Sequence, residues 1–265
     1  MSELTDEEWA ALKAALDAAR SGTGRPLRDE RTVVEGIVWR LRNGAKWRSL
    51  PSRFGPFRRR RTPGSTVAGR AVAHPLERVG GVGACLRTSA RCGKSRTGRR
   101  FPGRDIDPRA PEGGGRKGGV RRNRLGRSRG GYGTKAVVAC DGRGLALSVV
   151  LLCGQTSELK AAPDLLDAVC AIGPPVRVVC DRAYSSKAWR ERIEAAGAEA
   201  CVPANKTHPE VAYDKQAYKR RHRVENIWAR LKENRALSTR YEKTAASYIG
   251  NLHLAAMLDW LSNGL

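Results

Sequence analysis

Two amphipathic helical patterns open the chain. A Thr-Asp-Glu-Glu run that begins at Thr5 is typical of a capping box, and the apolar residues after it recur at helical spacing. A second helical pattern begins near Asp29 and ends near Asn43. Two helices joined by a short loop predict two-thirds of a helix-turn-helix, whose third helix would begin near Phe57. We therefore expect an N-terminal, helix-turn-helix-like domain over 1–56.

The last 140 residues or so alternate between short β-rich runs and helical runs. Thr134–Ala139 and Leu145–Leu152 flank an Asp-Gly turn and predict a β-hairpin. Val176–Cys180 is wholly apolar, which is typical of a strand that is buried on both faces. The remaining expected elements are a strand over 198–202 and helices over 156–171, 185–196, 218–232 and 245–261. These elements predict an α/β domain over 125–265.

The segment between these two parts has neither pattern. Residues 57–131 hold 21 Lys and Arg against 4 Asp and Glu, together with 16 of the 29 glycines. Such a segment buries too little apolar surface to offset its chain entropy, so we expect a basic, disordered arm over 57–124. A Gly-rich basic arm can bind nucleic acid by releasing counterions. The chain of 265 residues has a formal net charge of +24, which indicates a polyanionic partner.

Composition argues against several other classes of protein. No apolar run approaches the roughly 20 residues that cross a bilayer, and the N-terminus lacks a signal-peptide pattern. We therefore expect a cytoplasmic protein that has no membrane partner. The seven cysteines are an odd number and include no Cys-x-x-Cys pair. Several lie among Val and Ala in expected strands, which favours reduced, buried thiols over zinc ligands or disulfides.

The expected helix over 218–232 carries the clearest candidate site. At about 100° per residue, its aromatic, arginine, carboxylate and lysine side chains fall within about 60° of one another. These residues are Tyr218, Arg221, Glu225 and Lys232. A separate apolar stripe, formed by Val224, Ile227, Trp228 and Leu231, lies about a quarter-turn away and can pack against the protein. An ordinary amphipathic helix with i,i+4 charge pairs explains the same pattern, so both interpretations stay open.

Asp181 is the second candidate. It closes the apolar strand in a Val-Val-Cys-Asp-Arg-Ala-Tyr run, and a loop and a helix follow it. Strand ends in α/β sheets are where ligands bind, and a carboxylate there can hold a hard cation. A turn or capping role explains a strand-end aspartate equally well. Asp141 is a further acid, but its Asp-Gly context predicts the hairpin turn, so we do not assign it to catalysis.

Together these motifs resemble the DDE transposases of bacterial insertion sequences, in the insertion sequence four/five group. Asp-x-Ala-Tyr after a strand is followed on a later helix by Tyr-x2-Arg-x3-Glu-x6-Lys, a pattern that the four residues of 218–232 match without a slip. The run Leu-Gly-Arg-Ser-Arg-Gly-Gly-Tyr-Gly-Thr-Lys at 125–135 and the Trp-Arg-Ser-Leu-Pro run at 47–51 also resemble the group. The similarity covers roughly 1–56 and 125–265 and is absent between them.

The resemblance implies an α/β, RNase H-like mixed sheet with flanking helices. It also implies that three carboxylates bind two divalent ions, usually Mg2+ (or Mn2+). It assigns Asp181 as the second acid and Glu225 as the third, each both catalytic and a metal ligand. Paired ions clamp the attacking and leaving oxygens of an in-line phosphoryl transfer, and carboxylates are their natural ligands. The implied activity is DNA strand cleavage and transfer at insertion-sequence ends.

The resemblance also implies the partners. They are double-stranded DNA, as transposon ends and as target, and a second copy of the chain in a homodimer, within the cytoplasm at the nucleoid. Arginine suits bidentate phosphate contacts, which position the DNA without specifying its sequence. The implied DNA-binding residues are Tyr218, Arg221, Lys232, Arg182 and Tyr184.

One part of the family pattern is missing. The family places its first acid on the first strand of the fold, upstream of 125–135, where the arm offers only Asp105 and Asp107. Neither lies in an apolar run. We hypothesise that residues from about 57 to 120 are translated out of frame, because off-frame GC-rich codons encode Arg, Gly, Pro and Ala. One encoding of 103–107, shifted by one base, yields Asp-Gly-Thr-Ser, the first-acid motif. The chain would then be a degenerate, inactive transposase.

Two other classes of function stay open. A non-catalytic DNA- or RNA-binding protein is explained by charge alone, and its binding would weaken steeply with salt. A structural nucleoid- or ribosome-associated protein is the other class, but it would not need a buried strand that ends in Asp181.

Overall fold

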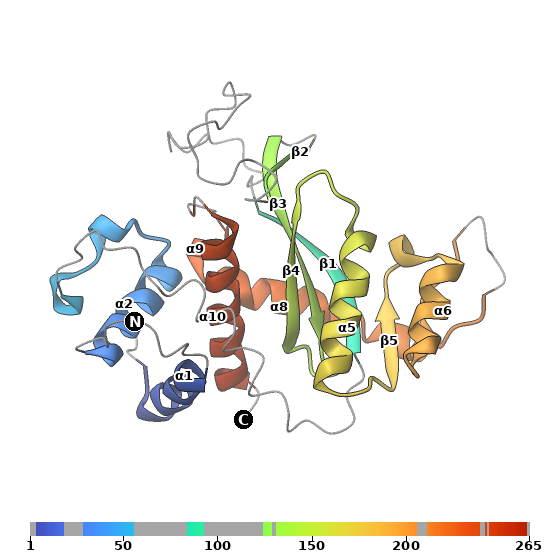
Figure 1. Cartoon of the computed structure of the whole chain (residues 1–265), viewed down its shortest axis with the longest axis horizontal. Helices are drawn as coiled ribbons and strands as arrows, with labels where there is room; N and C mark the ends of the chain where they lie inside the picture. Colours follow the sequence, from blue (N-terminus) through green and yellow to red (C-terminus); the bar gives the residue numbers. More distant parts are fainter. Residues whose placement is uncertain are drawn as a thin grey trace. The chain divides into compact units, whose positions relative to one another are not determined.

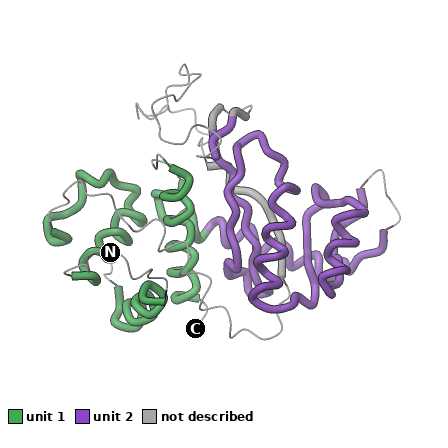
Figure 2. The backbone as a smooth tube through the Cα atoms, viewed as in Figure 1, with its two compact units in different colours: residues 1–75, 92–123, 230–265 green, residues 76–91, 124–229 purple. Residues whose placement is uncertain are grey.

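The computed structural model divides the chain into two compact units (Figure 2). One comprises residues 1–75, 92–123 and 230–265, and we call it the helical unit. The other comprises 76–91 and 124–229, and we call it the α/β unit. Both ends of the chain belong to the helical unit, and the three consecutive domains expected from the sequence stay a prediction. The described residues are 4–18, 29–55, 84–92, 124–128, 131–205, 211–238, 242 and 244–263.

The helical unit is built on α10, which contacts α1, α2 and α9. Both predicted N-terminal helices are present, and α10 extends slightly beyond the predicted 245–261. The third helix expected near Phe57 lies outside the described residues. The elements are α1 (Asp6–Ala18), α2 (Glu30–Asn43), η1 (Trp47–Ser49), η2 (Ser52–Phe54), α9 (Arg235–Ser238) and α10 (Ala245–Asn263).

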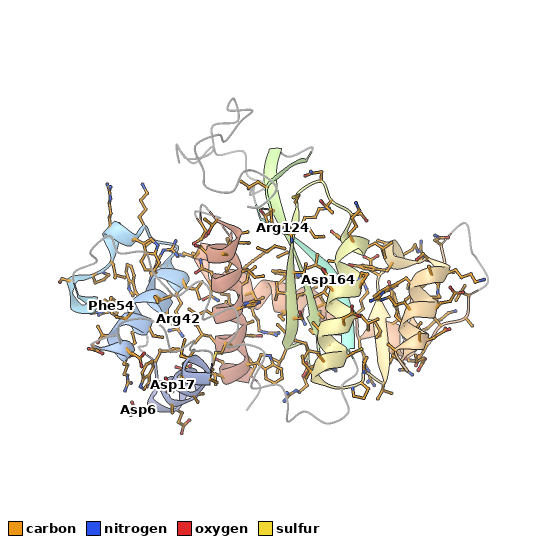
Figure 3. The ribbon with its side chains drawn as sticks, in the orientation of Figure 1. Asp6, Asp17, Arg42, Phe54, Arg124 and Asp164 are labelled. Atoms are coloured by element: carbon orange, nitrogen blue, oxygen red, sulfur yellow. The ribbon has the colours of Figure 1, made fainter. Side chains whose placement is uncertain are left out.

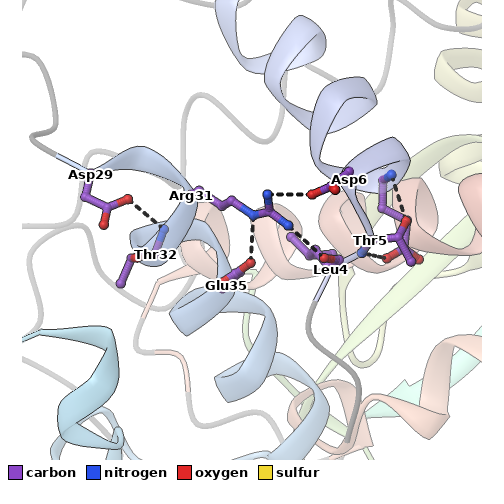
Figure 4. A network of polar contacts seen from close by, with 8 residues as sticks. Leu4, Thr5, Asp6, Asp29, Arg31, Thr32 and Glu35 are labelled. Atoms are coloured by element: carbon purple, nitrogen blue, oxygen red, sulfur yellow. Dashed lines mark hydrogen bonds and ion pairs between the residues drawn. The ribbon is translucent and has the colours of Figure 1, made fainter.

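Local capping fixes the starts of α1 and α2. The backbone N–H of Thr5 donates to Glu8 Oε2 at 3.0 Å, and the N–H of Glu8 donates back to Thr5 Oγ1 at 3.1 Å, which confirms the predicted capping box. Arg31 then joins the two helices, since it donates to Asp6 and to the carbonyl of Leu4 (Figure 4). Gly44 ends α2 in the left-handed region at φ 62°, where only glycine is unstrained.

A buried ion pair connects residues 202 positions apart within the helical unit. Arg40 Nη2 on α2 donates to Glu242 Oε1 at 2.7 Å, and both side chains are about 95% buried. Asn251 of α10 donates to the same oxygen at 2.6 Å. The guanidinium of Arg40 also lies 4.4 Å from the ring centroid of Trp47. This buried ion pair therefore links helix α2, near the start of the chain, to residues near its end.

His253 is a second buried polar group on α10. Its Nδ1 is buried and forms no hydrogen bond with any residue that the structure describes. Burial lowers the pKa of His253 to about 4, because the charged imidazolium would lose its hydration. The side chain is therefore neutral at pH 7.

The α/β unit contains a mixed sheet whose strand order is β2-β3-β1-β5-β6, with β4 paired to β3 (Figure 1). Strands β1 and β6 both pair in parallel with β5, whereas β2 and β4 pair antiparallel with β3. The strands are β1 (Ala84–Cys92), β2 (Gly126–Ser128), β3 (Gly131–Cys140), β4 (Ala146–Cys153), β5 (Arg177–Cys180) and β6 (Glu199–Cys201). The predicted hairpin and both later strands are thus confirmed.

Helices pack on this sheet as the sequence predicts. Helix α5 contacts β3 and β4 through buried Leu165 and Leu166, while Asp164 lies on its exposed side (Figure 3). A 3-10 turn precedes α5, because Pro163 sits in the first turn and starts a new helix there. The helical elements are η4 (Glu158–Ala161), α5 (Ala162–Ile172), η5 (Arg182–Tyr184), α6 (Lys187–Ala195), α7 (Lys215–Lys219) and α8 (His222–Glu233).

Asp141 forms the β3–β4 turn, as its Asp-Gly context predicts. Its buried Oδ1 accepts the backbone N–H groups of Arg143 and Leu145, each at 2.9 Å. Gly144 follows at φ 88°, and a Cβ there would lie 3.2 Å from the backbone oxygen of Arg223. The hairpin tip therefore packs closely against the first turn of α8.

Strand β1 lies within 57–124, the segment for which composition predicts a disordered arm. Residues Ala84–Cys92 are extended, and Ala84 to Leu86 pair with Val178 to Cys180 of β5. A sheet position satisfies backbone N–H and C=O groups whatever the side chains are, so a segment of this composition can supply a strand. That the family's first strand is missing stays a prediction. Apart from Arg124, the rest of the segment, including Asp105 and Asp107, lies outside the described residues.

Among the described helices, none is long and apolar enough to cross a membrane.

Replacing Glu242 tests the buried ion pair. Glu242→Gln leaves the buried Arg40 charge without its partner, so we expect the free energy of unfolding to fall by about 3 kcal/mol. Urea denaturation measures the change. The matched control is Glu191→Gln, which removes the exposed partner of Lys187 and should change stability by less than about 0.5 kcal/mol. Equal effects of the two substitutions would contradict this account.

The pH dependence of stability tests His253. Its pKa is lower in the folded state than the usual 6.5, so the unfolded chain binds the proton more readily. The contribution of neutral His253 to the free energy of unfolding is therefore fully present above pH 6.5, and it is lost as the pH falls toward 4. Relative to His253→Leu, the unaltered chain should lose about 3 kcal/mol between pH 7 and pH 4. Parallel stability curves for the two proteins would exclude this role.

Candidate active site

Asp181 lies at the carboxyl end of β5, the strand that pairs with both β1 and β6. Its Oδ1 accepts the backbone N–H of Ala183 and thereby caps η5, so the capping role considered from sequence is present. The other carboxylate oxygen, Oδ2, faces Arg221 at 3.9 Å from Nη1. The carboxylate is about one-quarter exposed. One oxygen therefore shapes the loop while the other is directed toward a cation.

The helix predicted over 218–232 is broken into two. Tyr218 lies on α7, Arg221 lies in the turn that follows, and Glu225 lies in the first turn of α8. Backbone N–H groups of 220, 221, 223 and 224 bond to carbonyls three residues earlier, which closes α7 before α8 begins. Four of the five residues in 219–223 are Lys or Arg, and like charges on successive turns destabilise a continuous helix. The prediction of one shared helix face is therefore wrong.

The break nevertheless places Arg221 between the two acids. Its Nη1 lies 3.9 Å from Asp181 Oδ2, and its Nη2 lies 3.5 Å from Glu225 Oε1. Two carboxylates that are 44 positions apart in the sequence thus lie within 4 Å of the same guanidinium. The i,i+4 pair of Arg221 and Glu225 that the sequence predicted is also present.

Aromatic rings support Arg221 from the side of α7. The guanidinium carbon lies 5.4 Å from the ring centroid of Tyr218, within the range of a cation–π contact. Tyr213 packs edge-on against Tyr218, with centroids 5.5 Å apart. Asp214 caps α7 by accepting the N–H groups of Gln216 and Ala217, and the bond from Ala217 contributes most to lowering the pKa of Asp214. Arg221 therefore projects from a locally ordered turn.

The apolar stripe of α8 is confirmed as a packing face. All four of its members are at least 90% buried: Val224, Ile227, Trp228 and Leu231. Glu225, by contrast, is about half exposed. The helix is amphipathic in the ordinary sense, and its polar side also carries one of the two acids.

The other predicted DNA-binding residues are placed differently. Arg182 is exposed beside Asp181, as DNA contact would require. Tyr184 is only 1% exposed and packs against Trp189 at 6.4 Å between ring centroids, so burial does not favour a DNA contact, which stays a prediction. Tyr184 closes η5 and is buried, whereas Arg182 at the start of the same turn is exposed. Lys232 is exposed in the last turn of α8, in the portion that belongs to the helical unit.

The chemistry of the acid pair suits a divalent cation, but the set is incomplete. Carboxylate oxygens are the ligands that Mg2+ and Mn2+ prefer. Asp181 and Glu225 each direct an oxygen at the same cationic group, so the two side chains could exchange that group for a metal ion. Within the described ranges, however, no three His, Cys, Asp or Glu side chains converge as a metal site. The described residues therefore bring two carboxylates to one cation but form no three-ligand metal site.

Arg190 on α6 is a residue that sequence reasoning missed. It is 91% buried, and its Nη2 donates to Ser185 Oγ and to the carbonyls of Val202 and Pro203, at 3.0 to 3.2 Å. Asn205 strengthens the same junction by donating to the carbonyl of Ser185. The guanidinium therefore ties the loop after Asp181 to the loop after β6. The sequence did contain a signal for this burial. Arg190 follows the helix cap Ser186 by four residues and lies beside the apolar residues Trp189 and Ile193, on the buried side of α6.

Comparison with known proteins identifies the family. A family model described as "Transposase DDE domain" matches residues 98–260, more than half of the chain. The chain belongs to the DDE transposases of insertion sequences. A second model, described as "Putative transposase of IS4/5 family", matches residues 4–63. The two matches cover residues 57–63 and 98–124 of the segment 57–124 of this transposase. The prediction that the family similarity is absent from the whole segment is therefore wrong for these residues.

Two curated relatives resemble the transposase chain. One is named "Putative transposase for insertion sequence element IS6501", from Brucella ovis, and is 32% identical over 130 residues. That alignment covers 48% of this chain and 98% of the relative. The other is "Uncharacterized protein y4sN" from Sinorhizobium fredii, 29% identical over 55 residues, which are 21% of this chain and 44% of that protein. No solved structure matches the chain.

Replacing Arg190 tests how the Asp181 loop is held in this transposase. Arg190→Met keeps the aliphatic stem but removes the donor to three oxygens, so we expect a loss of about 3 kcal/mol in the free energy of unfolding. The control is Arg192→Met on the same helix, which removes an exposed pair with Asp167 and should cost less than about 1 kcal/mol. Urea denaturation compares the two variants, and similar losses would contradict the assignment.

Proposed function

We propose that this chain is a transposase polypeptide that binds the DNA ends of an insertion sequence but does not cleave them. Family membership establishes the transposase origin. The observation that carries the site assignment is the convergence of Asp181 and Glu225 on one guanidinium. We further propose that the α/β unit is an RNase H-like fold, which the parallel pairing of β1, β5 and β6 and the strand-end position of Asp181 support.

The proposed roles follow from charge and position. Asp181 and Glu225 would hold a divalent ion, Mg2+ or Mn2+, which supplies charge neutralisation at the attacking and leaving oxygens of a phosphodiester. Arg221 and the exposed Arg182 would bind phosphates beside these acids, and Tyr218 would support Arg221 through its ring. Lys232 would bind phosphate from the far end of α8. Homodimer formation on paired ends remains part of the proposal.

The proposed absence of cleavage is supported by the strand beside Asp181. The described sequence of β1, Ala-Cys-Leu-Arg-Thr-Ser-Ala-Arg-Cys, contains no carboxylate. Leu86 is paired with Cys180, so the next residue of β1, Arg87, follows at the level where Asp181 follows β5. An acid at that end of a neighbouring parallel strand would complete a three-carboxylate site. The frame hypothesis places the lost acid near codon 103, which lies outside β1 and outside the described residues.

A second candidate function is a non-catalytic nucleic-acid-binding protein. The net charge of +24 favours it, since counterion release by basic side chains is sufficient for affinity. This candidate assigns no role to Glu225, whereas the transposase proposal places it beside the phosphate-binding arginine.

A cleavage assay with Mg2+ on a DNA duplex that carries the insertion-sequence end tests the proposal. The chain as given should bind the duplex and leave it intact. A version with the reading frame restored across about 57–120 should cut it, and the same restored version with Glu225→Gln should not, because a carboxylate ligand is lost. Cleavage by the chain as given would contradict the proposed inactivity.

The remaining outcomes separate the two candidates. No cleavage by the restored version, together with binding unaffected by Glu225→Gln, would favour the non-catalytic function. The nucleotide sequence gives an independent test of the frame change. If no neighbouring frame encodes Asp-Gly-Thr near codon 103, the frame hypothesis fails.

A further inference from the structure

The contact between Arg221 and the acid pair indicates a function for Arg221 beyond phosphate binding. We propose that Arg221 is the resident counter-cation of Asp181 and Glu225, and that a divalent ion must displace its guanidinium to bind them. The inference rests on the proposed function, which assigns both acids to a metal site. It adds that metal binding and the release of Arg221 are one event.

Charge favours a cation beside the acid pair. Two carboxylates that face the same guanidinium repel each other less while that cation lies beside both, and Arg221 supplies such a cation. A guanidinium presents two terminal nitrogens on one planar group, so it can face one acid with each nitrogen. Nη1 faces Asp181 and Nη2 faces Glu225 in this way. The acids are therefore held near each other before any metal arrives.

The contacts of Arg221 with the acids are loose. Charged N–H···O bonds are usually about 2.8 Å long, whereas Arg221 lies 3.9 Å from Asp181 in an ion pair and 3.5 Å from Glu225. The same chain contains tight pairs for comparison, such as Arg230 with Asp259 at 2.6 and 2.9 Å. Arg230 is bidentate to a single carboxylate, while Arg221 divides its nitrogens between two. The pair around Arg221 is thus suited to exchange rather than to permanent structure.

The side chain of Arg221 can move away from the two acids without unfolding a helix. It lies in the turn between α7 and α8, its side chain is 22% exposed, and Tyr218 supports it from outside the acid pair. A metal ion between the acids would leave the guanidinium on the Tyr218 ring, free to bind a DNA phosphate. A guanidinium whose terminal nitrogens face two carboxylates has fewer N–H groups directed at a phosphate, so metal binding would strengthen the DNA contact of Arg221.

Mn2+ binding to the full chain, without DNA, tests the proposal. Electron paramagnetic resonance of free Mn2+ gives the dissociation constant. Arg221→Gln removes the competing charge, so we expect that constant to fall about tenfold. The matched control, Lys215→Gln, removes the same charge from an exposed position on α7 and should change the constant by less than about twofold. Arg221→Lys should fall between them, because one ammonium faces both acids poorly.

Thermal unfolding gives a second measurement on the same variants. Without Mn2+, Arg221→Gln removes one cation from the acid pair and should unfold at a lower temperature than the unaltered chain. Added Mn2+ should raise its unfolding temperature by more than it raises that of the unaltered chain, because the ion replaces the lost cation. An equal shift in both proteins would overturn the proposal, as would an unchanged or weaker Mn2+ affinity in Arg221→Gln.

Two further variants separate this inference from the proposed function. Asp181→Asn and Glu225→Gln should each weaken Mn2+ binding in the unaltered background. If they do so while Arg221→Gln fails to tighten binding, the counter-cation role is wrong and the metal site stands. If neither weakens binding, the metal site of the proposed function is itself wrong.

Discussion

The candidate site depends on one electrostatic contact, the guanidinium of Arg221 between Asp181 and Glu225. One acid closes a β-strand and the other begins an α-helix, so nothing local brings them together. The fold brings them to the same guanidinium, because the break between α7 and α8 places Arg221 where it reaches both. A continuous helix would instead have kept Arg221 in line with Glu225 along a single face.

The loops around this contact are held by shorter hydrogen bonds than the contact itself. Arg190 ties the Asp181 loop to the neighbouring loop through three acceptors, and Gly144 lets the hairpin tip pack against the start of α8. Loose ion pairing inside a firmly held frame is what a site needs if its charged groups are to exchange partners while the acids keep their positions. The helical unit shows the contrasting case, since Arg40 and Glu242 are buried and close.

Much of this architecture could be predicted from sequence because it is encoded locally. Thr5 and Glu8 predict the start of a helix, the Asp141 turn predicts a hairpin, and the apolar run over 176–180 predicts a buried strand. The conformation of each depends on residues within a few positions. The apolar stripe of α8 was also predictable, because periodicity reports burial directly.

The features that the sequence did not reveal share a non-local cause. The buried ring of Tyr184 packs on Trp189 in the following helix. Strand β1 lies in a segment whose composition predicts disorder, and it pairs with β5 from a distant part of the sequence. The Arg40–Glu242 pair crosses 202 positions, so no window of sequence could reveal it. The contact of Arg221 with Asp181 likewise required the fold.

The most direct test of the central claim is a crystal of the full chain soaked in Mn2+, with an anomalous difference map. The account predicts a peak that coordinates one oxygen of Asp181 and one of Glu225, with the guanidinium of Arg221 displaced from between them. A peak at one acid alone, or an Arg221 that stays between the acids beside bound Mn2+, would contradict it.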